Sequence, residues 1–444
     1  MWYAGVVERD VQRHPELRDV LAHLWGQGPG HVLLTSASRR ATALSIAQEL
    51  AARLAAEPFT RRHPASLSQG GAGFAMLYAA LGRISPENGW NTVGHRFLAD
   101  AVKAGAAGRA GLFDGGIAGL GVAAASLRGS TGAYERLLGR TDAAVAAVPD
   151  HDLVSGTAGA GLYLLLRPPG AKREDLLAAL VRSGGASPPY PMPAHRIPAG
   201  WTVAADYADC GLAHGVAGAL AVLALLARDG GGAGTDIAGT DIAGTGGAET
   251  GGAETGGAGT GGAEAGGAGT GGAGTGGAER SGTIRQVADW LLAQAGQDEW
   301  GTFWPAGVDG ATRYPSARRA SWCYGVPGVA RALWLAGDAV GEPRYRRVAT
   351  EAMERLLAAP AVWGLDTPGI CHGWAGLMLI SAAFGLDAAA NELFDRLCAG
   401  YDGRRPLGFD VPDPGLLTGA AGIALALLTV TAGDRFAASL FLAA

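Results

Sequence analysis

The sequence predicts an all-α protein whose helices close into an α/α toroid of seven helical hairpins. Three observations lead to this prediction. The chain of 444 residues is 48% hydrophobic but only 7% aromatic, so its apolar residues are mostly of types that favour helices over strands. A short glycine pattern recurs along the chain. Around each copy, segments with one apolar face alternate with segments that are apolar throughout, as expected for outer and inner helices.

At seven places along the chain the glycine pattern x-G-x-x-G is followed by an apolar run. Most copies lie about 40 to 60 residues apart, a spacing that suits a repeated pair of helices. Each glycine pair would allow close backbone approach where an inner helix starts, and would bring the preceding residue to one end of the barrel. The first glycines of the copies are Gly70, Gly116, Gly156, Gly215, Gly325, Gly373 and Gly419.

The interval between Gly215 and Gly325 is longer because it contains a low-complexity tract, residues 230–279. This tract repeats pentamers such as GGAGT and GGAET, and it has six acidic residues but no Lys, Arg or aromatic residue. Such a composition buries too little apolar surface to offset the entropy of ordering, so we expect a flexible insertion. The toroid would then span residues 66–444 around this insertion, and residues 1–65 would supply N-terminal helices that lead into the barrel.

The predicted outer helices include 38–54 and 283–295, in which charged and apolar residues alternate with a helical period. The segment Leu416–Gly433 is apolar and free of charge over 18 residues, which just reaches the length of a membrane span. Its Gly, Ala and Thr content, and the recurrence of the same pattern elsewhere in the chain, favour a buried helix. We therefore expect no membrane-spanning segment.

Charge and cysteine content exclude several classes of protein. Thirty-five Lys and Arg against 40 Asp and Glu give a net charge of -5, which leaves no basic excess for nucleic acid. Four cysteines are too few for a disulfide framework, and the start of the chain, MWYAGVVERDVQRH, lacks the pattern of a secretory signal. These features predict a soluble cytoplasmic protein.

Several residues that can carry chemistry lie immediately before the glycine pattern, where the toroid would bring them together. His214, Tyr324 and His372 occupy that position, and Cys323 and Cys371 each stand one residue earlier. Two sulfurs and one imidazole form a ligand set that suits tetrahedral zinc with one position left open. The pattern therefore predicts a zinc site formed by Cys323, Cys371 and His372, although a free cysteine is also commonly a small buried hydrophobe.

Other candidates remain beside this set. Cys210 lies four residues before His214 and could form a rival metal pair with it, but Gly211 and Gly215 favour a loop there. We expect Cys210 and Cys398 to be plain buried thiols. Asp152 and the Arg318–Arg319 pair are acid–base candidates, and helix capping or a solvated charge is the alternative for each.

These motifs together resemble the lanthionine synthetase C-like family. The resemblance rests on S-W-C-Y-G at 321–325, C-H-G at 371–373, A-H-G at 213–215 and the seven glycine motifs, and it covers about residues 66–433 outside the Gly-rich tract. It implies an α/α toroid of seven hairpins that holds one zinc ion. It also implies cyclisation of a dehydrated precursor peptide, in which Cys thiols add to dehydroalanine or dehydrobutyrine to form (methyl)lanthionine thioether rings.

The resemblance further implies roles for individual residues and partners. The C-H pair looks more like the stand-alone cyclases than the cyclase domain of bifunctional synthetases, which implies a separate dehydratase and allows an exporter complex. The implied zinc ligands are Cys323, Cys371 and His372, and the implied catalytic residues are the acid/base His214, its acidic partner Asp152, the cation Arg319, and Tyr324.

The residue chemistry is consistent with such a reaction. A zinc ion stabilises the thiolate form of a substrate cysteine. Addition to a dehydro residue places negative charge on an enolate oxygen, which a cation such as Arg319 could stabilise. His214 suits protonation of the α-carbon near neutral pH, and Asp152 could orient His214 or hold it protonated.

Three rival functions remain open at this point. A thiol transferase that adds glutathione to dehydro residues would use the same scaffold, and it differs in whether the nucleophilic thiol belongs to the same peptide. A glycosidase would need paired carboxylates across a cleft, and Asp152 is the one credible acid. A non-catalytic zinc-stabilised scaffold that binds peptides would show a closed fourth zinc position and no catalytic effect of His214.

Overall fold

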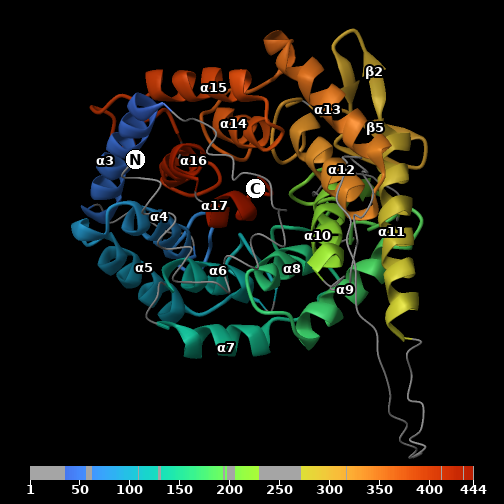
Figure 1. The fold of residues 1–444 in the computed structure, drawn as a ribbon, viewed down its shortest axis with the longest axis horizontal. Helices are drawn as coiled ribbons and strands as arrows, with labels where there is room; N and C mark the ends of the chain where they lie inside the picture. The colour runs from blue at the N-terminus through green and yellow to red at the C-terminus, as the bar shows by residue number, and fades with distance from the viewer. Residues whose placement is uncertain are drawn as a thin grey trace, which may run out of the picture.

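The structure is a computed structural model that describes residues 36–56, 63–108, 110–128, 132–193, 196–197, 206–229, 272–316, 318–411, 413–433 and 435–443. Within these ranges the helices form a closed toroid with an inner and an outer layer (Figure 1). Each inner helix contacts the next one along the chain, and the last inner helix contacts the first. The predicted all-α toroid of seven hairpins is therefore confirmed.

In the described part of the chain, seven helices line the inside and seven cover the outside. The inner helices are α4 (Gly71–Ile84), α6 (Ile117–Leu127), α8 (Thr157–Leu165), α10 (Val216–Asp229), α12 (Val326–Val340), α14 (Trp374–Ala383) and α16 (Ala420–Ala432). The outer helices are α3 (Ala37–Ala56), α5 (Trp90–Ala104), α7 (Glu135–Ala144), α9 (Ala171–Gly184), α11 (Gly272–Gln294), α13 (Pro343–Leu357) and α15 (Asp387–Ala399). Two 3-10 turns, Pro86–Asn88 and Pro360–Val362, lie between helices.

Burial separates the two layers as the sequence pattern predicts. The inner helix α16 is buried along nearly its whole length, whereas the outer helix α3 buries one face only. Because each buried Leu is fully enclosed, replacing one such as Leu425 by Ala would cost about 2–5 kcal/mol. Leu416–Gly433 thus contains a buried helix, as expected. Among the described helices none combines the length and the apolar character needed to cross a bilayer.

The glycine pattern allows the loop before each inner helix to fold back over the helix N-terminus. A Cβ atom at Gly325 would lie 2.4 Å from the carbonyl oxygen of Arg319, and one at Gly328 would lie 2.3 Å from that of Trp322. This close approach lets the loop carbonyls accept hydrogen bonds from the first free N–H groups of the helix, for example Val326 N–H to Arg319 O at 2.8 Å. The backbone of the loop therefore caps the helix, and no side-chain cap is present there.

These seven pre-helix loops are also joined to one another in a closed circle of backbone hydrogen bonds. The circle fixes all seven loops at one end of the toroid, which is where the residues before each glycine motif were predicted to meet. Its donor and acceptor pairs are Ser68 to Phe113, Phe113 to Val154, Leu153 to Ala213, Ala213 to Cys323, Cys323 to Cys371, Cys371 to Leu417, and Leu416 to Ser68.

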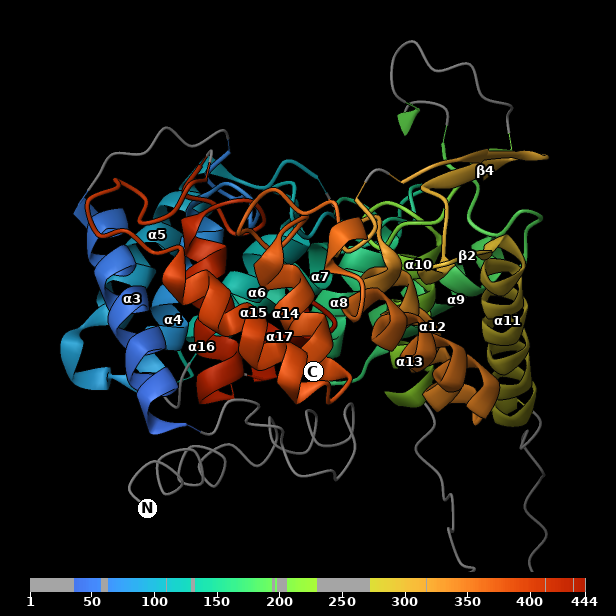
Figure 2. The ribbon, with the colours of Figure 1, turned by 90° about the horizontal axis from the view of Figure 1, so that it is seen from above.

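Two small antiparallel sheets stand at one end of the toroid (Figure 2). Strand β1 (Ala208–Asp209) pairs with β4 (Gly307–Asp309), which pairs with β5 (Thr312–Tyr314); β2 (Gly296–Asp298) and β3 (Gly301–Phe303) form a separate hairpin. The sequence analysis did not anticipate these strands. Each has only two or three residues, which is too short for an alternating pattern to be visible.

The C-terminal segment fills the centre of the toroid. Helix α17 (Arg435–Leu440) lies inside the circle of inner helices (Figure 1). The indole of Trp322 donates a hydrogen bond to Phe441 O at 3.1 Å, and Arg331 Nε donates to Leu442 O at 2.7 Å. Because Phe441 is fully buried against these neighbours, this part of the interior is a packed core.

The predicted segment boundaries are only partly covered by the described residues. Of the expected insertion 230–279, residues 230–271 lie outside them, and α11 begins at Gly272, inside the segment assigned to the insertion. Arg280, directly after the segment assigned to the insertion, forms an ion pair with Glu174 of α9 and so joins α11 to the outer layer. Of the expected N-terminal region 1–65, residues 1–35 and 57–62 lie outside, and α3 packs on α16 as an outer helix of the toroid.

Candidate metal centre and active site

The three predicted metal ligands lie together. The sulfur atoms of Cys323 and Cys371 and a ring nitrogen of His372 are all within 4.8 Å of one another. They come from the loops before α12 and α14. A hydrogen bond of 3.1 Å from Cys323 N–H to Cys371 O joins these two loops. Two thiolates and one imidazole fit zinc by donor type, and three protein ligands leave a fourth tetrahedral position for substrate.

The two thiols influence each other strongly. A hydrogen bond with Cys371 is the largest cause that lowers the pKa of Cys323, and His372 and Ser321 add to it. The contact with Cys323, together with burial, raises the pKa of Cys371. A bound metal ion would take the place of the proton that the two sulfur atoms share, because metal ligation needs both thiols in the thiolate form.

His214 and Asp152 form a second group on the neighbouring loops before α10 and α8. His214 Nδ1 lies 2.8 Å from Asp152 Oδ2. The other carboxylate oxygen of Asp152 accepts hydrogen bonds from the N–H groups of Ser155 and Gly156 at 2.6 and 2.9 Å. These bonds fix the carboxylate, which is only 2% exposed, while the His214 side chain remains 35% exposed and within reach of a substrate.

The hydrogen bond between His214 and Asp152 favours the charged form of both. Burial lowers the pKa of His214, but the hydrogen bond and the charge of Asp152 outweigh it, so the net pKa is raised. Burial raises the pKa of Asp152, and the contacts with His214 and Ser155 outweigh that effect and lower it. The pair is therefore suited to hold a proton on His214 near neutral pH.

Tyr324 follows a predicted metal ligand in the sequence and lies near His214. It follows Cys323 directly, and its phenol centroid lies 6.3 Å from the imidazole of His214. Burial, together with the negative charge of the nearby Asp209 carboxylate, raises the pKa of Tyr324.

Arg319 is the predicted site residue that the structure does not join to the others. Its guanidinium binds Asp298 of β2 at 2.6 and 3.1 Å, donates to Gly301 O at 2.9 Å, and lies 5.1 Å from the ring centroid of Phe303. These partners all belong to the β2–β3 hairpin or its turn. Arg319 therefore ties the hairpin to the loop before α12.

The remaining two cysteines are not members of the candidate metal group. Cys210 is fully buried, as predicted, and burial raises its pKa. Cys398 on α15 is only half-buried, because it sits on the outer layer near the Arg39–Asp395 ion pair.

Sequence reasoning missed three residues of this site. Arg196 binds Asp150 through Nε at 2.5 Å and lies 3.7 Å from Asp152 Oδ2, and no motif marks it in the sequence. Ser321 Oγ lies 3.8 Å from the sulfur of Cys323 and accepts from Tyr324 N–H at 3.2 Å. Asp209 stands six residues before Gly215, a position that also holds Asp150 and Asp413 in other repeats, so an alignment of the repeats could have found it.

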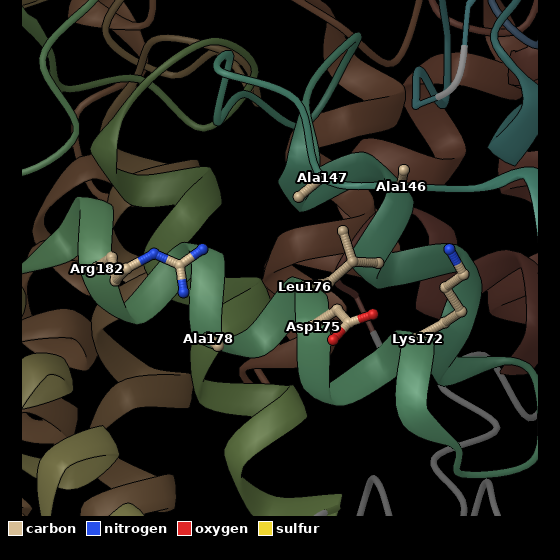
Figure 3. A pocket seen from close by; sticks show the side chains of 7 residues that line it. All are labelled: Ala146, Ala147, Lys172, Asp175, Leu176, Ala178 and Arg182. Carbon is tan, nitrogen blue, oxygen red and sulfur yellow. The ribbon is translucent and has the colours of Figure 1, made fainter.

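Two cavities lie on the described surface. One of about 280 Å³ adjoins the His214–Asp152 pair, because Asp150, Ser155 and Arg196 are among its lining residues. The other, of about 350 Å³, lies on the outer helix α9 and is lined by Lys172, Asp175 and Arg182 among others (Figure 3). None of the predicted site residues lines this outer cavity.

Comparisons with known proteins agree with this geometry. The family model described as "Lanthionine synthetase C-like protein" matches residues 62–234 and 273–442. The solved structure of "Nisin cyclase" is similar in fold, with a TM-score of 0.61 and 17% sequence identity over 91% of this chain and 97% of that chain. No curated protein sequence matches the chain. Because the family model spans most of the chain, this protein belongs to the lanthionine synthetase C-like family.

Proposed function

We propose that this protein is a zinc-dependent lanthipeptide cyclase, which adds the Cys thiols of a dehydrated precursor peptide to dehydroalanine or dehydrobutyrine. The observation that carries the proposal is the arrangement of two different groups at one end of the toroid. A set of residues suited to bind a metal, Cys323, Cys371 and His372, lies on loops joined by backbone hydrogen bonds to the loop of His214, a candidate proton donor. Thioether formation needs both an activated thiol and a proton donor.

Cys323, Cys371 and His372 would hold the zinc ion. When bound there, zinc would lower the pKa of an incoming cysteine thiol and keep its sulfur in the nucleophilic thiolate form. The pre-helix loops hold the three ligands through the backbone bond between Cys323 and Cys371, so little reorganisation is needed on binding.

The remaining step is a proton transfer that residues of the chain can perform. The thiol loses its proton, its sulfur forms a bond to the β-carbon of the dehydro residue, and the double-bond electrons move onto the carbonyl as an enolate. Protonation of the α-carbon then completes the thioether, so the product has the same mass as the substrate. His214, with its raised pKa and its bond to Asp152, is suited to donate this proton.

Arg319 has a second assignment in this proposal. The family resemblance implies that it stabilises the enolate, and its ion pair with Asp298 gives it a role in holding the β2–β3 hairpin. Asp298→Asn would free the guanidinium but loosen the hairpin. Activity that falls in Arg319→Lys and not in Asp298→Asn supports the enolate role, whereas equal losses assign Arg319 to the hairpin alone.

The proposal also defines partners and location. A cyclase requires a peptide that already contains dehydro residues. The proposal therefore includes a separate dehydratase that supplies this peptide. The proposal places the enzyme in the cytoplasm. It also includes an exporter complex, through which the enzyme would associate with the membrane.

The test uses a synthetic peptide with one dehydroalanine and one free cysteine, incubated with the zinc-loaded protein and glutathione. Cyclisation consumes the free thiol of the peptide, so the product no longer reacts with an alkylating reagent, while the peptide mass stays unchanged. A mass increase by one glutathione would instead identify a thiol transferase. If the amount of free peptide thiol and the peptide mass both equal those of the protein-free control, the protein is a binding scaffold and the proposed activity is rejected.

A further inference from the structure

Arg196 is the one basic side chain among the described residues that line the cavity of about 280 Å³. The loops before α6 and α8 supply the rest of the wall, in which small residues such as Ala107, Gly108 and Gly111 leave room for a peptide. The volume is close to the lower end of the range for ligand sites, which suits a residue as small as dehydroalanine.

Arg196 and His214 contact the same carboxylate oxygen. His214 Nδ1 lies 2.8 Å from Asp152 Oδ2, and Arg196 Nη2 lies 3.7 Å from that oxygen. Arg196 Nε donates to Asp150 Oδ2 at 2.5 Å, which fixes the guanidinium from one side. The Asp152 side chain is only 2% exposed, whereas those of Arg196 and His214 are 33% and 35% exposed. A cation and a candidate proton donor, both open to substrate, therefore flank one buried carboxylate.

The guanidinium of Arg196 has unused donors, and that of Arg319 does not offer them to substrate. Within the described part of the chain, neither Nη1 nor Nη2 of Arg196 makes a hydrogen bond. Both terminal nitrogens of Arg319 donate to the β2–β3 hairpin, and its Nε is buried. A hydrogen bond to a substrate oxygen would therefore break an existing bond at Arg319 but not at Arg196.

The charges around the cavity favour a cation as the partner of an enolate. Asp114 and Asp150 line the cavity, and the lining residue Ser155 donates to Asp152 Oδ1 at 3.0 Å. The enolate formed by thiol addition is an anion, and carboxylates this near oppose its formation. A guanidinium stays protonated at neutral pH, and its planar donors can bind the enolate oxygen.

We propose that Arg196 is a catalytic residue, whose guanidinium binds the carbonyl oxygen of the dehydro residue in this cavity and stabilises the enolate. The substrate thiol loses its proton to solvent, its sulfur bonds to the β-carbon, and the double-bond electrons move onto the carbonyl oxygen beside Arg196. His214 then gives a proton to the α-carbon and regains one from solvent. The carbonyl oxygen is only two bonds from the α-carbon, so one substrate can reach both side chains.

This inference rests on the proposed function, and it gives Arg196 the role that the family resemblance implies for Arg319. Arg196→Gln tests it. Because the charge on the oxygen develops only in the transition state, we expect kcat for peptide cyclisation to fall about 10²–10³-fold. We expect KM to change less than about threefold and the zinc content to stay at the wild-type level. A kcat within about tenfold of wild type would overturn the proposal.

Arg128→Gln is the matched control. Arg128 also pairs with a carboxylate through Nε at 2.5 Å, that of Glu135, and its side chain is 26% exposed. It follows the C-terminal end of α6, opposite to the end that carries the pre-helix loop. We expect kcat within about twofold of wild type. A loss as large as that of Arg196→Gln would show that removing any such ion pair is enough, and would overturn the proposal.

A double-mutant cycle separates contact with substrate from an effect through Asp152. If Arg196 binds the substrate oxygen, Arg196→Gln should still lower kcat more than about tenfold when it is made in Asp152→Asn. If Arg196 only orients the carboxylate that holds His214, this second loss should nearly disappear. A loss below about tenfold in the Asp152→Asn background would therefore overturn the proposal.

The same measurements distinguish a failure of this inference from a failure of the proposed function. Wild type that consumes no peptide thiol would overturn both. Wild type that cyclises the peptide, together with Arg196→Gln that cyclises it equally well, would overturn the role of Arg196 alone and leave Arg319 as the cation.

Discussion

The pre-helix loops of the toroid fall into two halves with the same backbone and different chemistry. The loops before α8, α10, α12 and α14 carry Asp152, His214, the Cys323–Tyr324 pair and the Cys371–His372 pair. The loops before α16, α4 and α6 share the circle of backbone hydrogen bonds but carry none of the predicted site residues. Ser66 of the loop before α4 donates to Phe113 O of the loop before α6 at 2.6 Å.

This difference shows how the repeat supports a site. The glycine motifs fix the backbone equally in all seven loops, and the residues one to four positions before the first glycine determine the chemistry of each loop. We call the first set the reactive half and the second set the structural half. The predictions below test whether this division is correct.

The largest effect is expected for the metal ligands of the reactive half. Cys371→Ala should reduce peptide cyclisation to the rate without enzyme, because thiol activation is lost. The measurement is thiol consumption at unchanged peptide mass. Cys398→Ala on α15 is the matched control and should retain wild-type activity. Cyclisation by Cys371→Ala above about a tenth of the wild-type rate would contradict the assignment of this residue as a ligand.

The second prediction compares one loop position in the two halves. His214→Asn removes the proposed proton donor and should lower kcat by about 10²–10⁴-fold with little change in zinc content. Thr418 occupies the same position in the structural half, so Thr418→Ala should leave kcat within about twofold. Steady-state kinetics measures both. Similar losses in the two variants would mean that the position serves loop structure alone.

A third prediction tests whether the backbone is equally important in both halves. A Cβ atom would lie 2.0 Å from Ile370 O at Gly376 and 1.7 Å from Leu416 O at Gly422. Each change to Ala should lower the free energy of unfolding by about 2–4 kcal/mol in chemical denaturation. Gly139 in the outer helix α7 has open space around it, and Gly139→Ala should stabilise by about 0.5–1 kcal/mol. A neutral Gly422→Ala would limit the glycine requirement to the reactive half.

The smallest effect is a pH dependence of stability that only the reactive half should show. The raised pKa of His214 gives stability that is present below about pH 6.5 and is lost as the pH rises through the folded-state pKa. The lowered pKa of Asp152 gives stability that is present above about pH 4 and is lost on acidification. The pair therefore stabilises most between about pH 4 and 6.5.

Denaturation of wild type and His214→Asn at pH 5.5 and pH 9 measures this contribution. The difference between the two proteins should be smaller at pH 9. The corresponding difference for Thr418→Ala should be the same at both pH values, because the Thr418 hydroxyl does not titrate there. A pH-independent difference for His214→Asn would argue against the ion pair.

The sequence predicted the parts of the molecule that the repeat encodes. Seven glycine motifs before apolar runs were enough to place the inner helices, and the shared position of Cys323 and Cys371 was enough to bring the metal ligands together. Arg196 was missed because it acts through contacts with Asp150 and Asp152 in a different loop, and spacing along the chain carries no record of such a contact. The strands of two or three residues were missed because they are shorter than the period that identifies a strand.

The most direct test of the account is the zinc content of the purified protein, measured by elemental mass spectrometry in wild type, Cys323→Ala and Cys210→Ala. The account predicts one zinc per chain in wild type and in Cys210→Ala, which removes the rival ligand that the sequence also offers, and none in Cys323→Ala. Wild-type protein that contains no zinc and takes up none on titration, or Cys323→Ala that retains a full equivalent, would contradict it.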